Sequence, residues 1–587
     1  MTMSRMSHIT LPDQKRATTK QHLPATFSQL FSLQASLLAP KLLQKIMNWG
    51  EDSLMHPSAH LDSFTRDNLP PLEQWPEFKF DLPNLQFGPT LNATKALLDD
   101  ALTEGASDKV AIYNSHGNLT YSDLAKLVNK IAYILTDEFN FKPGNRLLIR
   151  GPNNPMFAAI FLACLKAGGV AVPTMPMLRS KELSTIIKKA QISHVITDSR
   201  LKEELLDAEE DCPEVQFSLT YGLDGILDAL LDNASDQFTA VETASDDVAM
   251  LAFTSGTTGE PKACMHFHRD VMAMAETFSK HIVKPNGNDV MAGSPPLAFT
   301  FGLGGMLIFP LHARCSTVLD ESIGPDGLLD AVETFNVTTL FPAPTAYRAI
   351  LDNLQNRDIS SVHTCVSAGE TLPKVTSDAW FAKTGIRMID GIGATEMIHI
   401  FISASGDDIR PGATGKPVPG YEACILDDND QPLPAGGTGR LAVKGPPGCR
   451  YLADDRQKDY VINGWNVTGD TYTLDEDGYY WYQARSDDMI ISSGYNIAGP
   501  EVENAALQHP AVSECAVVGA PDADRGTVVK AFIVLKDGFE GNDDLTKDIQ
   551  TFIKGARAPD KYPRLVDYVD SLPKTQTGKL QRYKLKE

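Results

Sequence analysis

The fold and chemistry of this chain are decided by the stretch Leu251-Ala-Phe-Thr-Ser-Gly-Thr-Thr-Gly-Glu-Pro-Lys262. An apolar segment, Val248–Phe253, predicts a buried strand, and a dense run of hydroxyls and glycines follows it. Glycines let backbone N–H groups approach an anion, hydroxyls add further donors, and Lys262 adds a positive charge. Kinases and GTPases carry Gly-Lys-Ser/Thr in their phosphate loop, whereas Gly259 is followed here by Glu260-Pro-Lys-Ala263. We therefore expect a phosphate-binding loop of another type.

The composition is that of a globular protein with an acidic surface. Of the 587 residues, 42% are hydrophobic and 22% are charged, and the net charge is −22. No basic stripe is visible, so we expect no nucleic-acid partner. The longest apolar run, Met156–Leu165, is well short of the ~20 residues of a membrane span, so we expect none. The scattered cysteines, without a Cys-x-x-Cys pair, indicate reduced, intracellular usage.

Residues 1–55 form an N-terminal extension of different composition. Basic residues outnumber acids over the first fifty positions, and Ser, Thr, Gln and Leu are frequent. This is typical of an organelle transit peptide, although an unstructured extension or a start codon placed too early would look the same. We expect a cytoplasmic protein, or one of the mitochondrial matrix if residues 1–50 are a transit peptide.

Beyond Ala59, strand-like segments alternate with segments of helical periodicity. Ser122–Phe139 and Pro155–Ala167 are predicted as helices, and Arg146–Arg150 and Val170–Pro173 as strands. This alternation predicts parallel α/β layers.

The predicted fold class is α/β, with a large N-terminal domain of several subdomains and a small mobile α+β C-terminal domain. Residues 56–486 form the first domain, with two parallel-type α/β lobes and a β-rich subdomain from about Val418, where Gly and Pro cluster. Residues 487–587 form the second domain.

Five motifs in order resemble those of the adenylate-forming enzymes, the superfamily of acyl-CoA synthetases, peptide-synthetase adenylation domains and luciferases. They are Thr254–Lys262, Gly391-Ile-Gly-Ala-Thr-Glu396, Thr468-Gly-Asp470, Arg485-Ser-Asp-Asp488 and Pro573-Lys-Thr-Gln-Thr-Gly-Lys-Leu-Gln-Arg582. The resemblance covers nearly all of the chain from about residue 59. It implies that ATP activates a carboxylate as an acyl-adenylate, and that the acyl group then passes to coenzyme A.

The resemblance also implies an ATP site assembled from these motifs. The implied ATP-binding residues are Thr254, Ser255, Gly256, Thr257, Thr258, Lys262, Gly369, Glu370, Thr371, Asp390, Gly391, Ile392, Gly393, Asp470 and Arg485. Asp470 offers two acceptor oxygens suited to a ribose diol, and Ile392 a flat apolar contact for adenine. Glu396 is the implied ligand of Mg²⁺, a hard cation that prefers oxygen.

Lys579, Glu396 and Thr395 are the implied catalytic residues. Negative charge builds as the carboxylate attacks the α-phosphate, and a positioned ammonium such as that of Lys579 stabilises it. Asp487 matches the hinge about which the C-terminal domain swings in the family, and Gly494 and Tyr495 match the loop that then faces the CoA thiol. The chain departs from the family pattern at Asn496, where many relatives carry a basic residue.

Within the superfamily the chain resembles the benzoate and 2-aminobenzoate–CoA ligases most. The segments that carry this are Arg66–Pro71 with Gln74–Pro76, Arg150–Pro155, Gly393–Phe401 and Ser486–Glu501. The implied ring pocket consists of Thr300, Phe301, Gly393, His399 and Ile400. Phe301 can cover a ring face, and His399 can meet a ring substituent or be an ordinary core histidine.

The sequence therefore predicts an ATP-dependent acid–CoA ligase acting on 2-aminobenzoate (anthranilate) or benzoate. Its expected partners are a small aromatic carboxylic acid, ATP, Mg²⁺ and coenzyme A, and homodimerisation stays open. A medium-chain fatty acid is an alternative substrate, because an apolar slot separates ring from chain poorly. A stand-alone adenylation enzyme that loads a carrier protein, a regulatory pseudoenzyme and a luciferase-like oxygenase are further alternatives.

Overall fold

The computed structural model describes residues 56–254, 261–321, 324–485, 488–492, 495–522, 526–556, 562–574 and 580–586. Contacts divide the chain into Met1–Ser53 and Leu54–Glu587, and all of the described residues belong to the second unit. Within these described ranges, no helix has the length and apolar character needed to cross a membrane.

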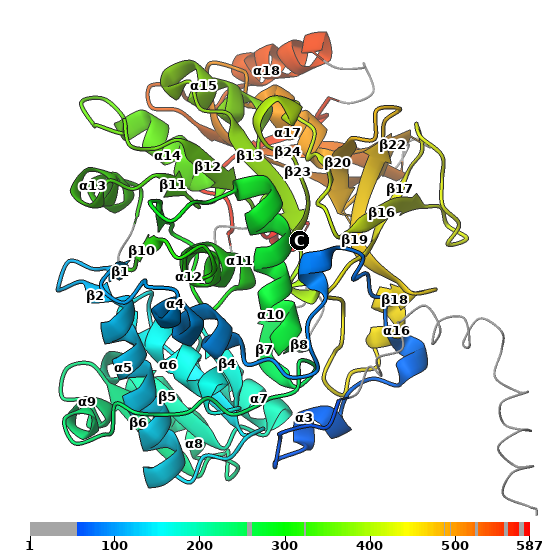
Figure 1. Ribbon diagram of the computed structural model, residues 1–587. Coiled ribbons are helices and arrows are strands. Elements are labelled where there is room, and N and C mark those ends of the chain that lie inside the picture. Colours follow the sequence, from blue (N-terminus) through cyan, green and yellow to red (C-terminus); the bar gives the residue numbers. More distant parts are fainter. Residues whose placement is uncertain are drawn as a thin grey trace, which may run out of the picture. The chain divides into compact units, whose positions relative to one another are not determined.

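A six-stranded sheet carries the hydroxyl-rich stretch at one of its ends. Its strand order is β6-β5-β3-β4-β7-β8. The strands are β3 (Arg146–Arg150), β4 (Val170–Thr174), β5 (His194–Asp198), β6 (Phe217–Tyr221), β7 (Val248–Thr254) and β8 (Lys262–Phe267). All neighbours pair in parallel except β7 and β8. Because helices accompany the sheet, β3, β4 and β5 are buried along their whole length (Figure 1).

The helices around this sheet are amphipathic or fully apolar, as burial on a sheet requires. They are α5 (Tyr121–Tyr133), α6 (Pro155–Lys166), α7 (Ser180–Ala190) and α8 (Lys202–Glu209). Thr120 and Asp123 form a capping box at the start of α5, and Asn154 caps α6 by accepting from Phe157 N. The predicted helices and strands of this region are therefore confirmed, within a few residues at their ends.

A nine-stranded sheet supplies the second α/β lobe, in the order β15-β14-β13-β12-β11-β9-β10-β1-β2. Its strands are β1 (Val110–Tyr113), β2 (Leu119–Thr120), β9 (Val290–Ala292), β10 (Ser316–Val318), β11 (Thr339–Leu340), β12 (Thr364–Ser367), β13 (Met388–Gly393), β14 (Ile400–Ser403) and β15 (Lys416–Pro417). Its helices include α11 (Thr300–Leu303), α13 (Pro325–Phe335), α14 (Pro344–Asn353) and α15 (Lys374–Thr384), whereas α10 (His268–Met274) contacts β7 and β8 of the first sheet. The central strands are parallel, and β14 runs antiparallel to β13.

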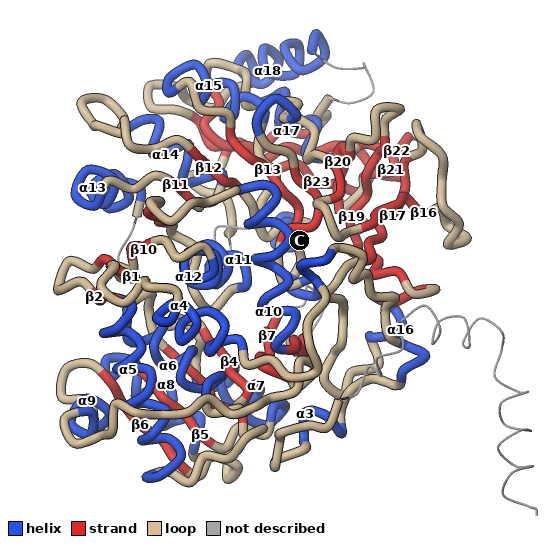
Figure 2. The backbone as a smooth tube through the Cα atoms, viewed as in Figure 1, coloured by secondary structure: helices blue, strands red, loops and turns tan. Residues whose placement is uncertain are grey.

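The β-rich part and the C-terminal part follow in the sequence, and their strands are drawn in red in Figure 2 together with those of the two lobes. An antiparallel sheet contains β16 (Glu422–Leu426), β17 (Thr438–Lys444), β18 (Val461–Ile462), β19 (Trp465–Leu474) and β20 (Tyr480–Arg485). The last part contains β21 (Ile490–Ser492), β22 (Tyr495–Ile497), α17 (Gly499–Ala506), β23 (Val512–Asp522), β24 (Gly526–Leu535), α18 (Asp543–Ala556) and β25 (Leu565–Tyr568). It has its own small core, formed by Val502, Val517, Ile533 and Ile549 among others.

This architecture confirms the expected fold class of parallel-rich α/β lobes, a β-rich subdomain and a small α+β unit. The domain boundaries near residues 56 and 487 stay predictions. Sequence reasoning missed β8, because it treated Lys262 as the end of a loop. Five of the six residues of β8 are buried, so the strand shows no alternation that periodicity could detect.

Candidate functional site

Strands β7 and β8 hold the two ends of the hydroxyl-rich stretch side by side. Thr254 and Lys262 are directly paired across these antiparallel strands. The residues between them, which include the predicted ATP contacts Ser255, Gly256, Thr257 and Thr258, lie outside the described residues. The hydroxyl of Thr254 is buried and has no hydrogen-bond partner among the described residues.

Lys262, Glu396 and Tyr451 form a charged cluster beside this hairpin. The Lys262 ammonium lies 3.6 Å from a carboxylate oxygen of Glu396, which is buried to 7% exposure. The Lys262 ammonium also donates to the Tyr451 hydroxyl at 2.7 Å, and that hydroxyl donates to Glu396 Oε1 at 2.5 Å. Burial, and then the charge of Glu396, raise the pKa of Tyr451 far above its usual range, so the phenol keeps its proton.

A chain of buried polar contacts supports the backbone of the turn that carries Glu396. His266, on β8, lies with its Nε2 2.8 Å from the carbonyl oxygen of Thr395, and its Nδ1 is 3.8 Å from Asp270. Asp270 in turn forms an ion pair with the fully buried Arg450. Burial raises the pKa of Asp270, but the charge of Arg450 and the proximity of His266 outweigh burial and keep this pKa below its usual value.

The predicted adenine wall lies at the end of β13. Asp390, Gly391, Ile392 and Gly393 are consecutive on this strand, and Gly391 has no room for a side chain, because a Cβ there would lie 2.6 Å from Ile400. Removal from water raises the pKa of the Asp390 carboxyl to about 7, although a hydrogen bond from the Gly391 backbone opposes this. Gly369 has a φ of +90° and faces open space, as a backbone wall for a ligand requires.

Asp470 and Arg485 face each other across β19 and β20. They are directly paired in the register, and their charged groups are 3.3 Å apart. Arg485 also lies 3.4 Å from the carbonyl of Thr468, within the predicted ribose motif. The Arg485 guanidinium thus donates to the Asp470 carboxylate, although the two residues are 15 positions apart in the sequence.

Aromatic side chains, here called the aromatic box, surround His399, which is one residue of the predicted ring pocket. The imidazole ring lies 4.7 Å from the ring of Phe309, 5.2 Å from Phe278 and 5.7 Å from Phe301, measured between centroids. It packs against Gly304, where a Cβ would lie 2.5 Å from the ring. His399 is 2% exposed, and neither of its nitrogens has a hydrogen-bond partner of good geometry in the part of the chain that the structure describes.

His399 is therefore neutral under ordinary conditions. Burial lowers its pKa to about 3, and the nearby Phe301 backbone offsets this only in part. His399 is buried like an ordinary core histidine, but its ring nitrogens lack the hydrogen bonds that buried polar atoms usually make within the described residues. Thr300 begins α11 and is half-buried, and Ile400 is buried at the start of β14.

The catalytic and hinge predictions from the C-terminal part lie outside the described residues. These are Lys579, Asp487 and Gly494, together with the side chain of Tyr495.

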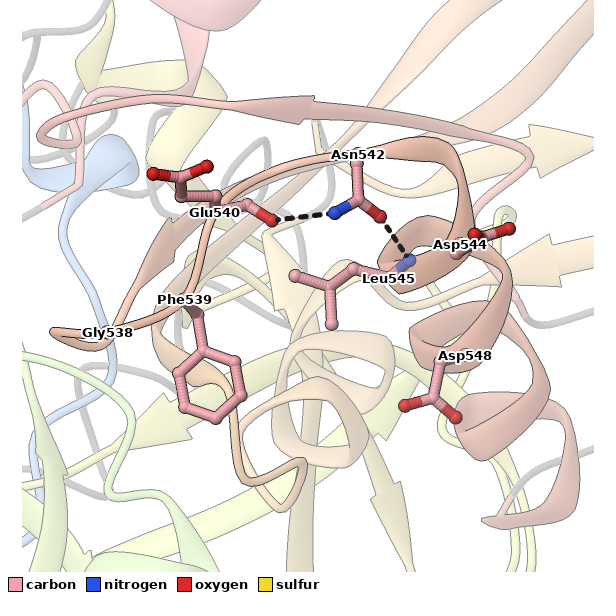
Figure 3. A pocket seen from close by; sticks show the side chains of 7 residues that line it. All are labelled: Gly538, Phe539, Glu540, Asn542, Asp544, Leu545 and Asp548. Carbon is pink, nitrogen blue, oxygen red and sulfur yellow. Dashed lines mark hydrogen bonds between the residues drawn. The ribbon is translucent and has the colours of Figure 1, made fainter.

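The described C-terminal residues form a surface hollow of about 750 Å³ at the start of α18, where Asn542 donates to Glu540 O and accepts from Leu545 N (Figure 3). The carboxylates of Glu540, Asp544 and Asp548 line this hollow, so it would repel an anionic substrate.

Sequence reasoning missed Tyr451, His266 and Arg450 as parts of the site. Tyr451 lies in a segment rich in Gly and Pro, and its partners Lys262 and Glu396 are 189 and 55 positions away. No local pattern could have identified it.

Among the described residues, no group of three or more His, Cys, Asp or Glu side chains could hold a metal by itself. A divalent cation would take Glu396 as one ligand and substrate phosphates as others, which is how Mg²⁺ is commonly bound.

Comparison with known proteins gives two family matches and several similar proteins. Residues 99–450 match the family described as AMP-binding enzyme, and residues 501–579 match the AMP-binding enzyme C-terminal domain. The chain is 33% identical over 521 residues to a benzoate–CoA ligase of Thauera aromatica, with 86% of this chain and 97% of that protein covered. It is also 33% identical over 485 residues to a mitochondrial acyl-coenzyme A synthetase of Mus musculus, with 80% and 84% covered.

A solved structure is also similar to this chain in fold and in sequence. The anthranilate CoA ligase AuaEII, solved in complex with anthranoyl-AMP, superposes with a TM-score of 0.82 at 31% sequence identity. The superposition covers 86% of this chain and 98% of that one.

Proposed function

Because the chain belongs to the AMP-binding enzyme family and is an AMP-forming acid–CoA ligase, we propose that its substrate is a small planar aromatic acid, 2-aminobenzoate or benzoate. The observation that carries this proposal is the aromatic box around His399. Phe301 is only partly buried and its ring lies 5.7 Å from the imidazole, so it can offer a flat substrate ring an aromatic neighbour, since aromatic pairs favour offset or edge-to-face contacts.

His399 supplies the polar contact of this proposed pocket. Its imidazole is neutral and has no good partner, so it can accept a hydrogen bond from an ortho amine or donate one to another substituent. A medium-chain acid is the second candidate, because the same box is apolar and the relatives include a mitochondrial acyl-coenzyme A synthetase.

ATP and coenzyme A are the co-substrates of this ligase, and we propose how the chain holds the nucleotide. Thr254, Lys262 and the loop between them would bind phosphates. The wall at Asp390–Gly393 would contact adenine, and Asp470 with Arg485 would hold the ribose. Glu396 would hold Mg²⁺, which would neutralise phosphate charge.

The C-terminal part would supply the other roles. Lys579 would stabilise the adenylation transition state, Asp487 would be the hinge, and Gly494 with Tyr495 would face the thiol.

A panel of acids tests the substrate class. AMP release that depends on both ATP and CoA should be measured with 2-aminobenzoate, benzoate, hexanoate and octanoate. We expect the aromatic acids to exceed the chain acids in kcat/KM by roughly tenfold, since an aromatic contact adds ~0.5–1.5 kcal/mol beyond area burial. Faster turnover of octanoate than of either aromatic acid would overturn the substrate class and leave the ligase chemistry intact. Replacing CoA by a carrier protein tests the carrier-loading alternative.

The role of His399 is tested by the ratio between two substrates. We expect His399→Ala to lower the ratio of kcat/KM for 2-aminobenzoate to that for benzoate. Phe278→Leu is the matched control, because it disturbs the packing of the same imidazole and removes no polar atom. If both variants lower the two rates together and leave the ratio unchanged, His399 has only a packing role.

A further inference from the structure

The hydroxyl of Tyr451 lies between two opposite charges that form a long ion pair without a direct hydrogen bond. A well-formed ion pair of ammonium and carboxylate has N···O distances of ~2.7–2.9 Å, whereas Lys262 and Glu396 are 3.6 Å apart. Each of them contacts the phenol instead, at 2.7 Å and 2.5 Å. A phenol has one proton to give and lone pairs to accept with, so it can serve both partners at the same time.

The backbone of Tyr451 is fixed independently of these charges. Its N–H donates to Oε1 of Gln457 at 2.8 Å, and the residue forms a bridge with Cys264, which follows Lys262 by two positions on β8. The ring of Tyr460 packs edge-on against that of Tyr451 at 5.8 Å. The hydroxyl is therefore held in place by the fold, and both charged side chains contact it.

We propose that Tyr451 is a positioning residue for adenylation, whose hydroxyl keeps Lys262 and Glu396 apart so that both charges remain available to the ATP phosphates and their divalent cation. This inference rests on the proposed roles of Lys262 and Glu396. Without the hydroxyl, this long ion pair would shorten to a hydrogen-bonded one, and both side chains are largely buried. That pair would compete with the phosphates for the ammonium and with the cation for the carboxylate.

Tyr451→Phe tests the inference, because it keeps the ring and removes the bridge. The matched control is Tyr460→Phe, since the hydroxyl of Tyr460 is buried without a hydrogen-bond partner among the described residues. The full-length proteins should be titrated with ATP in the absence of acid substrate by calorimetry, once with Mg²⁺ and once with a chelator. A thermal melt of each variant reports whether it folds.

We expect Tyr451→Phe to raise the Kd for ATP with Mg²⁺ at least tenfold and to change the Kd without the metal much less. Tyr460→Phe should bind ATP as the wild type does. Formation of the thioester from supplied acyl-adenylate should be unchanged in both variants. An unaltered effect of Mg²⁺ on ATP binding in a folded Tyr451→Phe protein would overturn the inference. A wild-type protein that fails to bind ATP would instead overturn the proposed nucleotide site.

Discussion

The Nε2 atom of His266 lies 2.8 Å from the carbonyl oxygen of Thr395, and this contact ties β8 to the turn that carries Glu396. The same strand begins at Lys262, so one strand carries the proposed phosphate-binding lysine and also supports the proposed metal-binding carboxylate. The two partners are 129 positions apart in the sequence. The tertiary fold therefore couples two motifs that are separate in the chain.

Replacing His266 should impair adenylation more than it impairs folding. His266→Ala leaves the buried carbonyl of Thr395 without its donor, which costs about 1–3 kcal/mol and lets the turn at Glu396 move. We expect a five- to hundredfold lower kcat for acid-dependent pyrophosphate release. His266→Gln, which can still donate, should recover part of this rate. If the alanine and glutamine variants lose the same activity, the hydrogen bond to Thr395 has no role in positioning Glu396.

Lys579→Ala should separate the two half-reactions. The lysine is proposed to stabilise only the first transition state, and losing one such preorganised donor costs ~3–4 kcal/mol. Adenylation should therefore fall about 10²–10³-fold, while thioester formation from supplied acyl-adenylate should be retained. Both steps can be followed separately by pyrophosphate release and by loss of free thiol. An equal loss in the two steps would show that the assignment of Lys579 is wrong.

Removal of residues 1–55 should leave an active enzyme, whereas removal of residues 1–66 should destabilise it. The buried carboxylate of Asp247 accepts from the Ser58 hydroxyl, from Ala59 N at 3.0 Å and from Arg66 at 3.0 Å. Stripping these partners from a buried charge costs about 3–5 kcal/mol. Urea unfolding of the two truncated proteins measures the difference. Equal free energies of unfolding would contradict this account of Asp247, and an inactive 56–587 protein would show that the extension is needed.

The stability of the fold should fall as the pH drops below about 6.5, with a contribution from His268. Burial lowers the pKa of this histidine to about 3, so between pH 6.5 and 3 the unfolded chain binds a proton that the folded chain does not. His399 acts in the same direction, and Asp390, with its pKa raised to about 7, acts in the opposite one.

The variant His268→Gln measures the contribution of this one histidine to the pH dependence of stability. Between pH 6 and pH 5, the free energy of unfolding of this variant should decrease less steeply than that of the wild type, by about 1.2 kcal/mol over that pH unit. Urea titrations at both pH values measure the two slopes. Identical slopes would mean that His268 is protonated in the folded protein as readily as in the unfolded one.

The sequence by itself determined the elements whose signal is local. The loop between Thr254 and Lys262 was recognisable because phosphate binding needs glycines and hydroxyls close together, and the helices near α5 and α6 because helical periodicity repeats within a few residues. The predicted pairing of Asp470 with the ribose and the wall at Asp390–Gly393 likewise came from short motifs, and these roles stay predictions.

Only the tertiary structure decided how distant residues meet. Tyr451 lies between Lys262 and Glu396, and His266 supports Thr395, through contacts that span 55 to 189 positions. Such contacts leave no periodic trace, because each depends on the order of strands in a sheet and not on neighbours in the chain. His399 shows the same limit: its neutrality arises from burial among phenylalanines of other segments, which no pattern around residue 399 reveals.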